Sequence, residues 1–95
     1  MGNTVRKTLL SNASATGSAA TWPGGAGFFQ AEGTFDGASV DLQIQTPNGT
    51  WVDVGGETRI TANGMGFFYA PAGQVRAAVS GGTSPTALYA YIMRL

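Results

Sequence analysis

Two tight-turn motifs divide the stretch from Phe28 to Val54 into three short segments, and they constrain the fold more than any other feature of the sequence. Asp36-Gly37 fits a two-residue hairpin loop of type I′, because Asp and Gly tolerate the positive φ that this turn requires. Pro47-Asn48-Gly49 fits a longer loop, in which Pro starts a type I turn and Gly takes the left-handed position. The stretch is therefore predicted to be a three-stranded antiparallel meander.

The two turns together predict a register for this meander. Phe29 is expected to face Ile44 across the first turn, and Ile44 is expected to face Val52 across the second. Because side chains alternate along a strand, this register separates an apolar face from a polar one. The predicted buried face consists of Phe29, Ala31, Val40, Leu42, Ile44, Val52 and Val54. The predicted outer face consists of Phe28, Gln30, Glu32, Asp41, Gln43, Gln45, Trp51 and Asp53.

The segment before the meander also favours extended structure. Residues 5–11 are predicted to form a strand whose charged pair, Arg6 and Lys7, is typical of a sheet edge. Residues 12–20 are rich in Ser, Ala, Thr and Gly, which favours a packed strand of small residues but also suits a flexible linker. Residues 1–21 are thus expected to form either an edge strand or a looser N-terminal arm.

The C-terminal half repeats the pattern of short strands and turns. A second hairpin is predicted around Pro71-Ala72-Gly73, with Phe67 facing the core and Phe68 facing outward, opposite Arg76. Residues 86–94 are predicted to form the last strand, apolar on both faces and therefore covered on both sides. The whole chain, residues 1–95, is predicted to be one all-β domain. We expect a jelly-roll-like β-sandwich of eight or nine short antiparallel strands.

The composition argues for contacts with other proteins. Charged residues make up 11% of the chain and the net charge is zero, whereas about 25% is usual for a globular domain. Such a surface argues against binding to nucleic acid or to an anionic membrane. Outward-facing aromatic residues are enriched at protein interfaces. The predicted interface residues are Phe28, Trp51, Phe68, Tyr89, Tyr91 and Arg76.

No residue pattern predicts a catalytic site, a metal site or a cofactor. The chain lacks His and Cys, so the usual general base and the thiolate nucleophile are missing. Glu32 and Asp41 are predicted to lie side by side on the outer face. Paired carboxylates can act on glycosides or bind Ca²⁺, but two solvated groups, or groups that contact arginines of a neighbouring subunit, explain the pair as well. We therefore expect the protein not to be an enzyme.

A carbohydrate site is the alternative for the outer face. Trp51 would stack on a sugar ring, while Gln43, Gln45, Glu32 and Asp41 would bind its hydroxyl groups. The competing interpretation is an aromatic residue that packs under a loop or against another chain.

Several segments resemble a group of short proteins encoded by tailed bacteriophages near their virion structural genes. The resemblance covers most of the chain from Trp22 onward, and its motifs are turn and strand motifs. They are Trp22-Pro23-Gly24-Gly25, residues 33–43, Pro47-Asn48-Gly49-Thr50-Trp51, residues 70–77 and residues 87–90.

The resemblance implies a virion structural protein of the capsid decoration (cement) type. Such a protein binds the shell of major capsid protein and stabilises it. By analogy with decoration proteins of this size, we expect a homo-oligomer, with a trimer favoured. It would be made in the host cytoplasm and end on the capsid surface of the virion. The alternatives are a carbohydrate-binding module on the virion and a tail or connector component.

Overall fold

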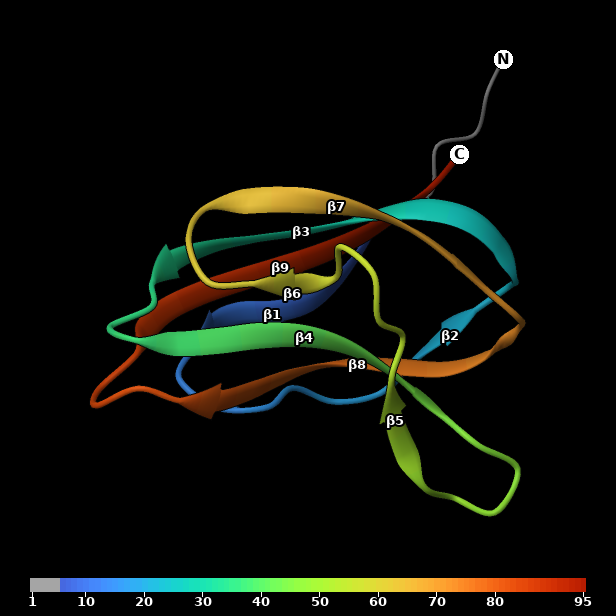
Figure 1. Cartoon of the computed structure of the whole chain (residues 1–95), viewed down its shortest axis with the longest axis horizontal. Coiled ribbons are helices and arrows are strands. Elements are labelled where there is room, and N and C mark those ends of the chain that lie inside the picture. The colour runs from blue at the N-terminus through green and yellow to red at the C-terminus, as the bar shows by residue number, and fades with distance from the viewer. Residues whose placement is uncertain (1–5) are drawn as a thin grey trace.

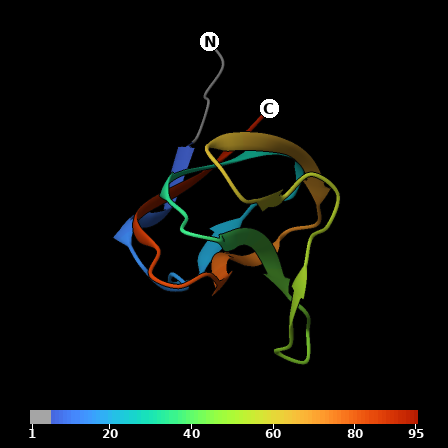
Figure 2. The ribbon, with the colours of Figure 1, turned by 60° about the vertical axis from the view of Figure 1, so that its left-hand side comes forward.

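The computed structural model describes residues 6–95, which form two antiparallel β-sheets packed face to face (Figures 1 and 2). No helix occurs in the described residues, and so none that could span a membrane. The strands are β1 (Arg6–Ala13), β2 (Ala20–Trp22), β3 (Gly25–Thr34), β4 (Ala38–Gln45), β5 (Trp51–Asp53), β6 (Arg59–Ile60), β7 (Gly64–Ala70), β8 (Gly73–Gly81) and β9 (Thr86–Arg94).

Strands that follow one another in the chain mostly lie in opposite sheets. Sheet I has the order β1-β9-β3-β7, and sheet II has the order β2-β8-β4-β5, with β6 also paired to β4. The chain therefore crosses from sheet to sheet at most of its turns. This two-sheet alternation is the jelly-roll arrangement, and it confirms the predicted fold class.

The first predicted turn forms, but the predicted hairpin does not. Asp36 and Gly37 have φ values of 51° and 88°, and the N–H of Ala38 donates a hydrogen bond to the Phe35 carbonyl over 2.8 Å. However, β3 pairs with β7 and β9, whereas β4 pairs with β8, β5 and β6. The expected pairing of Phe29 with Ile44 was therefore wrong.

The cause is a bulge that precedes the turn. The register of β3 against β9 shifts between Glu32 and Thr34, at Gly33 with a φ of 138°. A bulge bends its strand. Phe35 is then buried between the sheets, so the turn carries the chain from sheet I to sheet II.

The second predicted turn and its hairpin are confirmed. Gly49 has a φ of 89°, Ile44 pairs with Val52, and the N–H of Val54 donates to the Leu42 carbonyl over 2.9 Å. The predicted burial of Val52 was wrong, because its side chain is 41% exposed. The hairpin of β4 and β5 extends beyond the body of the sandwich (Figure 1), where no opposite sheet covers it.

The second predicted hairpin was also wrong, because β7 and β8 lie in different sheets. The predicted faces of β7 are reversed as well: Phe68 is 4% exposed, whereas Phe67 is 46% exposed. Phe68 packs on Trp22, with 5.0 Å between the ring centroids. Phe68 therefore belongs to the core and does not face outward opposite Arg76.

The N-terminal segment forms an edge strand, as predicted. Strand β1 pairs with β9 at the edge of sheet I, and Val5, which was assigned to this strand, lies outside the described residues. Residues 14–19 are not the expected strand of small residues. They run beside β8, where the Gly17 N–H donates to the Ala77 carbonyl over 3.1 Å and Thr16 accepts from the Val79 N–H over 3.0 Å.

The core fills the space between the two sheets. Its largest fully buried apolar side chains come from the inner faces of both sheets, β2 of sheet II included. They are Trp22, Phe29, Val40, Leu42, Val75, Leu88 and Ile92. The alternation in the last strand is confirmed, since Leu88, Ala90 and Ile92 face this core.

Candidate interaction surfaces

The outer face of sheet I carries a patch of aromatic and methionine side chains. Burial alternates along β3, β7 and β9, so every second residue of each strand faces outward. Phe28 pairs with Phe67 on one side and with Met93 on the other, and the two phenyl rings meet edge to face at 5.7 Å. We call this set the aromatic face; it consists of Phe28, Gln30, Glu32, Met65, Phe67, Tyr69, Tyr89, Tyr91 and Met93.

The most exposed part of the aromatic face lies on β7. Met65, Phe67 and Tyr69 are 50%, 46% and 75% exposed. Phe28, Tyr89, Tyr91 and Met93 are half-buried among their neighbours. Large exposed apolar patches usually mark contact sites. The patch is thus a candidate protein interface.

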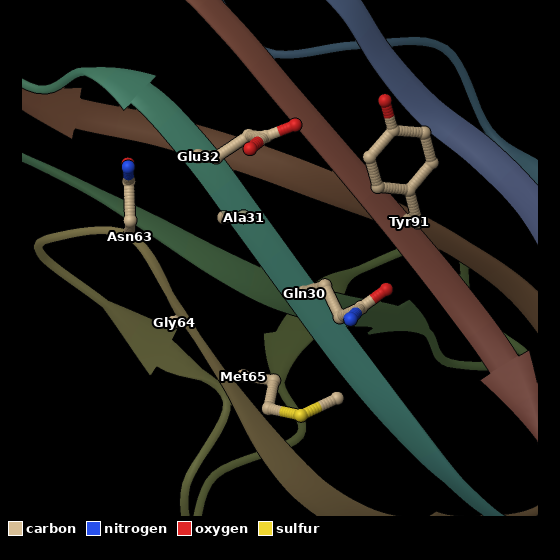
Figure 3. A pocket seen from close by; sticks show the side chains of 7 residues that line it. All are labelled: Gln30, Ala31, Glu32, Asn63, Gly64, Met65 and Tyr91. Atoms are coloured by element: carbon tan, nitrogen blue, oxygen red, sulfur yellow. The ribbon is translucent and has the colours of Figure 1, made fainter.

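A shallow pocket of about 270 Å³ opens on the aromatic face (Figure 3). Gln30 and Glu32 project from β3 into it, with Tyr91 on β9 and Met65 on β7 at its sides. Asn63 lies at its end and accepts a hydrogen bond from the Gly33 N–H over 2.9 Å. Small-molecule sites usually measure about 300–1,000 Å³. The pocket therefore suits one side chain of a partner protein better than a large ligand.

The outer face of sheet II carries a polar cluster, which consists of Gln43, Gln45, Trp51, Asp53 and Arg76. Strand β4 runs between β5 and β8, so Gln43 lies beside Asp53 on one side and Arg76 on the other. The Gln43 side-chain amide donates to Asp53 Oδ1 over 3.0 Å and accepts from Arg76 Nε over 2.9 Å. The Arg76 guanidinium lies 4.4 Å from the centroid of the Trp51 ring.

The polar cluster is largely satisfied by its own contacts. The Gln43 amide uses both its oxygen and its nitrogen, and the Gln45 amide donates to the Gly49 carbonyl over 3.2 Å. A guanidinium stacked on an indole is a cation–π contact that fixes both groups. A ligand could stack on the Trp51 ring, which Arg76 holds in place, but it would have to displace or share these hydrogen bonds.

The predicted pair of Glu32 and Asp41 does not exist. Glu32 lies on the outer face of sheet I, whereas Asp41 lies on β4 in sheet II. The prediction failed because it depended on pairing β3 with β4. In the described residues no group of three or more His, Cys, Asp or Glu side chains is placed to hold a metal ion.

Asp41 is buried instead of solvated. Its Oδ2 lies 3.6 Å from Nη1 of Arg59, and its Oδ1 has no hydrogen-bond partner within residues 6–95. A second arginine nitrogen, Nη2, donates to Ser39 Oγ over 3.4 Å. Asp41 thus takes part in a structural ion pair beside a pocket of about 190 Å³.

The predicted site residues divide between the two surfaces. Phe28, Tyr89, Tyr91 and Glu32 lie on the aromatic face, while Trp51, Arg76, Gln43 and Gln45 lie in the polar cluster. Phe68 and Asp41 are buried. Met65, Phe67 and Tyr69 were not among the predicted interface residues. The sequence shows that apolar residues alternate here. Because Phe67 and Phe68 are adjacent and both apolar, however, the pattern does not tell which of the two faces the core.

Comparison with known proteins finds a shared fold. No family model and no curated protein matches the sequence. Among solved structures, the chain is similar to the SPBc2 prophage-derived protein YomS, with a TM-score of 0.73 and 12% sequence identity. The match covers 96% of this chain and 93% of that one. The two chains thus share their fold over nearly their whole length.

Proposed function

We propose that this protein is a structural component of a bacteriophage virion, namely a capsid decoration protein that binds the shell of major capsid protein. The observation that carries the proposal is the aromatic face, where Met65, Phe67 and Tyr69 stand exposed on a regular sheet. Two further arguments support a phage origin: the resemblance of the turn and strand motifs to phage proteins, and the likeness in fold to a prophage-derived protein.

The aromatic face is suited to a permanent contact. Burial of one large apolar side chain contributes roughly 1.5–3 kcal/mol. A few such side chains per subunit would hold the protein on a folded shell. The pocket beside Glu32 would accept one projecting side chain of the capsid protein, and a basic one fits the carboxylate and the tyrosine ring best.

The experiment locates the protein in purified virions and measures its occupancy. Cryo-electron microscopy should show density on the capsid, and Tyr91→Ala should lower the number of copies per particle, because it removes one side of the pocket and part of the aromatic face. Trp51→Ala is the matched control, since it removes an outward aromatic residue from the opposite sheet. Density on the tail would support the tail or connector alternative, and absence from the virion would contradict the proposal.

A carbohydrate-binding function is the second candidate, and the polar cluster is the observation that favours it. Trp51 offers a ring for stacking, with the side-chain amides of Gln43 and Gln45 beside it. A glycan array tests this candidate. A strong hit that Trp51→Ala abolishes and Tyr91→Ala leaves intact would favour the carbohydrate-binding module over the decoration protein.

A further inference from the structure

Strand β7 forms an edge of sheet I, and no strand pairs with its outer side in the described part of the chain. The Phe67 N–H points away from β3, because it donates to the Glu57 carboxylate over 3.1 Å. In an antiparallel sheet, the N–H and C=O of one residue point to the same side, and the side alternates along the strand. Met65, Phe67 and Tyr69 therefore all direct their backbone groups outward.

The two edges of sheet I differ in how they resist further pairing. The β1 edge carries Arg6 and Lys7, and its register shifts twice against β9. Charges and bulges are the usual protection of an edge strand. By contrast, β7 has seven residues without a charge or a proline, and it pairs with β3 without a register shift. The β7 edge is therefore a regular template for another strand.

We propose that β7 pairs with β7 of a second copy of this chain, antiparallel and across a twofold axis at Phe67. In this register the two Phe67 residues face each other, and Met65 faces Tyr69 of the second copy. The contact is isologous, and the paired β7 strands carry no charge. The Glu57 carboxylates of the two copies, which both lie at Phe67, must move aside. The contact also places aromatic and methionine side chains in favourable contact.

Pairing would give hydrogen-bond partners to the outward N–H and C=O groups of Met65, Phe67 and Tyr69 on each chain. Sheet I would continue through the contact as an eight-stranded sheet, since each copy contributes four strands. The aromatic faces of the two copies would then form one continuous surface. A trimer was expected from analogy; a closed ring would need β7 to meet a different edge, whereas the twofold contact uses the same regular β7 edge twice.

Glu57 regulates this edge. Its Oε1 accepts from the Phe67 N–H, and thus takes the place of the carbonyl that a paired strand would provide. The second copy must displace this carboxylate, which returns to water because Glu57 is exposed. Removal of the Glu57 carboxylate is therefore expected to strengthen the pairing rather than weaken it.

Analytical ultracentrifugation of the purified chain tests the pairing without any capsid. The natural protein should reach a monomer–dimer equilibrium. Phe67→Lys places two like charges opposite each other and removes apolar contact, so the dissociation constant should rise at least about tenfold. Glu57→Ala should lower it by about tenfold or more, because a charge-assisted hydrogen bond no longer competes. Val52→Lys is the matched control, since Val52 is similarly exposed at 41% but lies in sheet II.

Disulfide trapping tests the register. The natural chain has no Cys, so a single introduced thiol reports one contact. The Cα atoms of a hydrogen-bonded antiparallel pair lie about 5.5 Å apart, which a disulfide spans. Phe67→Cys should oxidise to a covalent dimer much faster than Val52→Cys. If Phe67→Lys does not fold, Tyr69→Lys serves instead, because that side chain is 75% exposed.

Several outcomes would overturn the pairing: a strictly monomeric protein at millimolar concentration, a trimer, or Phe67→Cys and Val52→Cys that oxidise at equal rates. None of these results depends on where the protein sits in a virion. Capsid occupancy with a monomeric protein would refute the pairing and leave the decoration function intact, whereas a dimer absent from virions would do the reverse.

Discussion

The adjacent residues Phe67 and Phe68 lie in opposite environments, because Phe67 is exposed and Phe68 is buried. Phe68 packs against Trp22, and the indole N–H of Trp22 donates to the Ala70 carbonyl over 3.3 Å. This hydrogen bond removes the cost of burying the indole nitrogen. Gly27 leaves room for the ring, since a Cβ there would lie 2.7 Å from Trp22 Cη2. Phe67, one residue earlier, stands in solvent beside Phe28.

The two side chains should therefore differ in their contribution to stability. Phe68→Ala should lower the free energy of unfolding by about 3–5 kcal/mol, because it leaves a cavity beside Trp22. Phe67→Ala should lower it by about 1 kcal/mol or less, because the ring is already half exposed. Urea denaturation at a dilute protein concentration measures both. Equal losses would contradict the observed orientation of β7.

At the scale of elements, the passage from β3 to β4 decides the topology. Gly33 combines a φ of 138° with close packing, because a Cβ there would clash with the backbone carbonyl of Ala87. The bulge lets β3 leave sheet I, after which the Asp36-Gly37 turn delivers the chain to sheet II. The Asp36 carboxylate also accepts from the Ser84 N–H over 2.8 Å, which ties this turn to the loop before β9.

Replacement of Gly33 should therefore lower the free energy of unfolding by more than backbone strain alone would. Gly25 is the matched control: it has a φ of 105°, but a Cβ there would meet nothing within 4 Å. Gly25→Ala should destabilise by about 1 kcal/mol, the cost of a positive φ for a residue with a Cβ. Gly33→Ala should cost at least about 1 kcal/mol more, because β9 must also move. Thermal unfolding of the two variants measures the difference, and equal melting temperatures would refute the role of the close approach.

The whole molecule is weakly charged and presents two different outer faces. The aromatic face of sheet I is largely apolar, whereas the polar cluster of sheet II is held by hydrogen bonds and the stacked Arg76. If such a molecule binds a partner through its aromatic face, the contact is apolar, and screening by salt does not weaken it.

The proposed attachment to a capsid should accordingly survive high salt. Between about 0.1 M and 1 M NaCl the screening length falls from about 10 Å to about 3 Å, so a charge-driven contact would weaken strongly. The number of copies per virion, measured by gel densitometry after washing, should change by less than about twofold. Release of the protein at 1 M NaCl would show that ion pairs hold it and would count against the aromatic face.

The residue pattern alone was enough to predict most of the local structure. The all-β class, the positive φ values of Asp36, Gly37 and Gly49, the hairpin of β4 and β5, and the faces of β9 were all correct. These features depend on a residue and its near neighbours along the chain. Turn chemistry and the alternation of side chains carry that information directly.

The tertiary structure decided which strands pair and therefore which side chains meet. A tight turn reverses the chain in the same way whether the next strand joins the same sheet or the opposite one, so the pairing of β3 with β4 was not determined locally. The separation of Glu32 from Asp41, the burial of Phe68 and the exposed edge of β7 all follow from that choice. Packing of two sheets around one core settles it, because the crossed arrangement buries Trp22, Phe35 and Phe68 together.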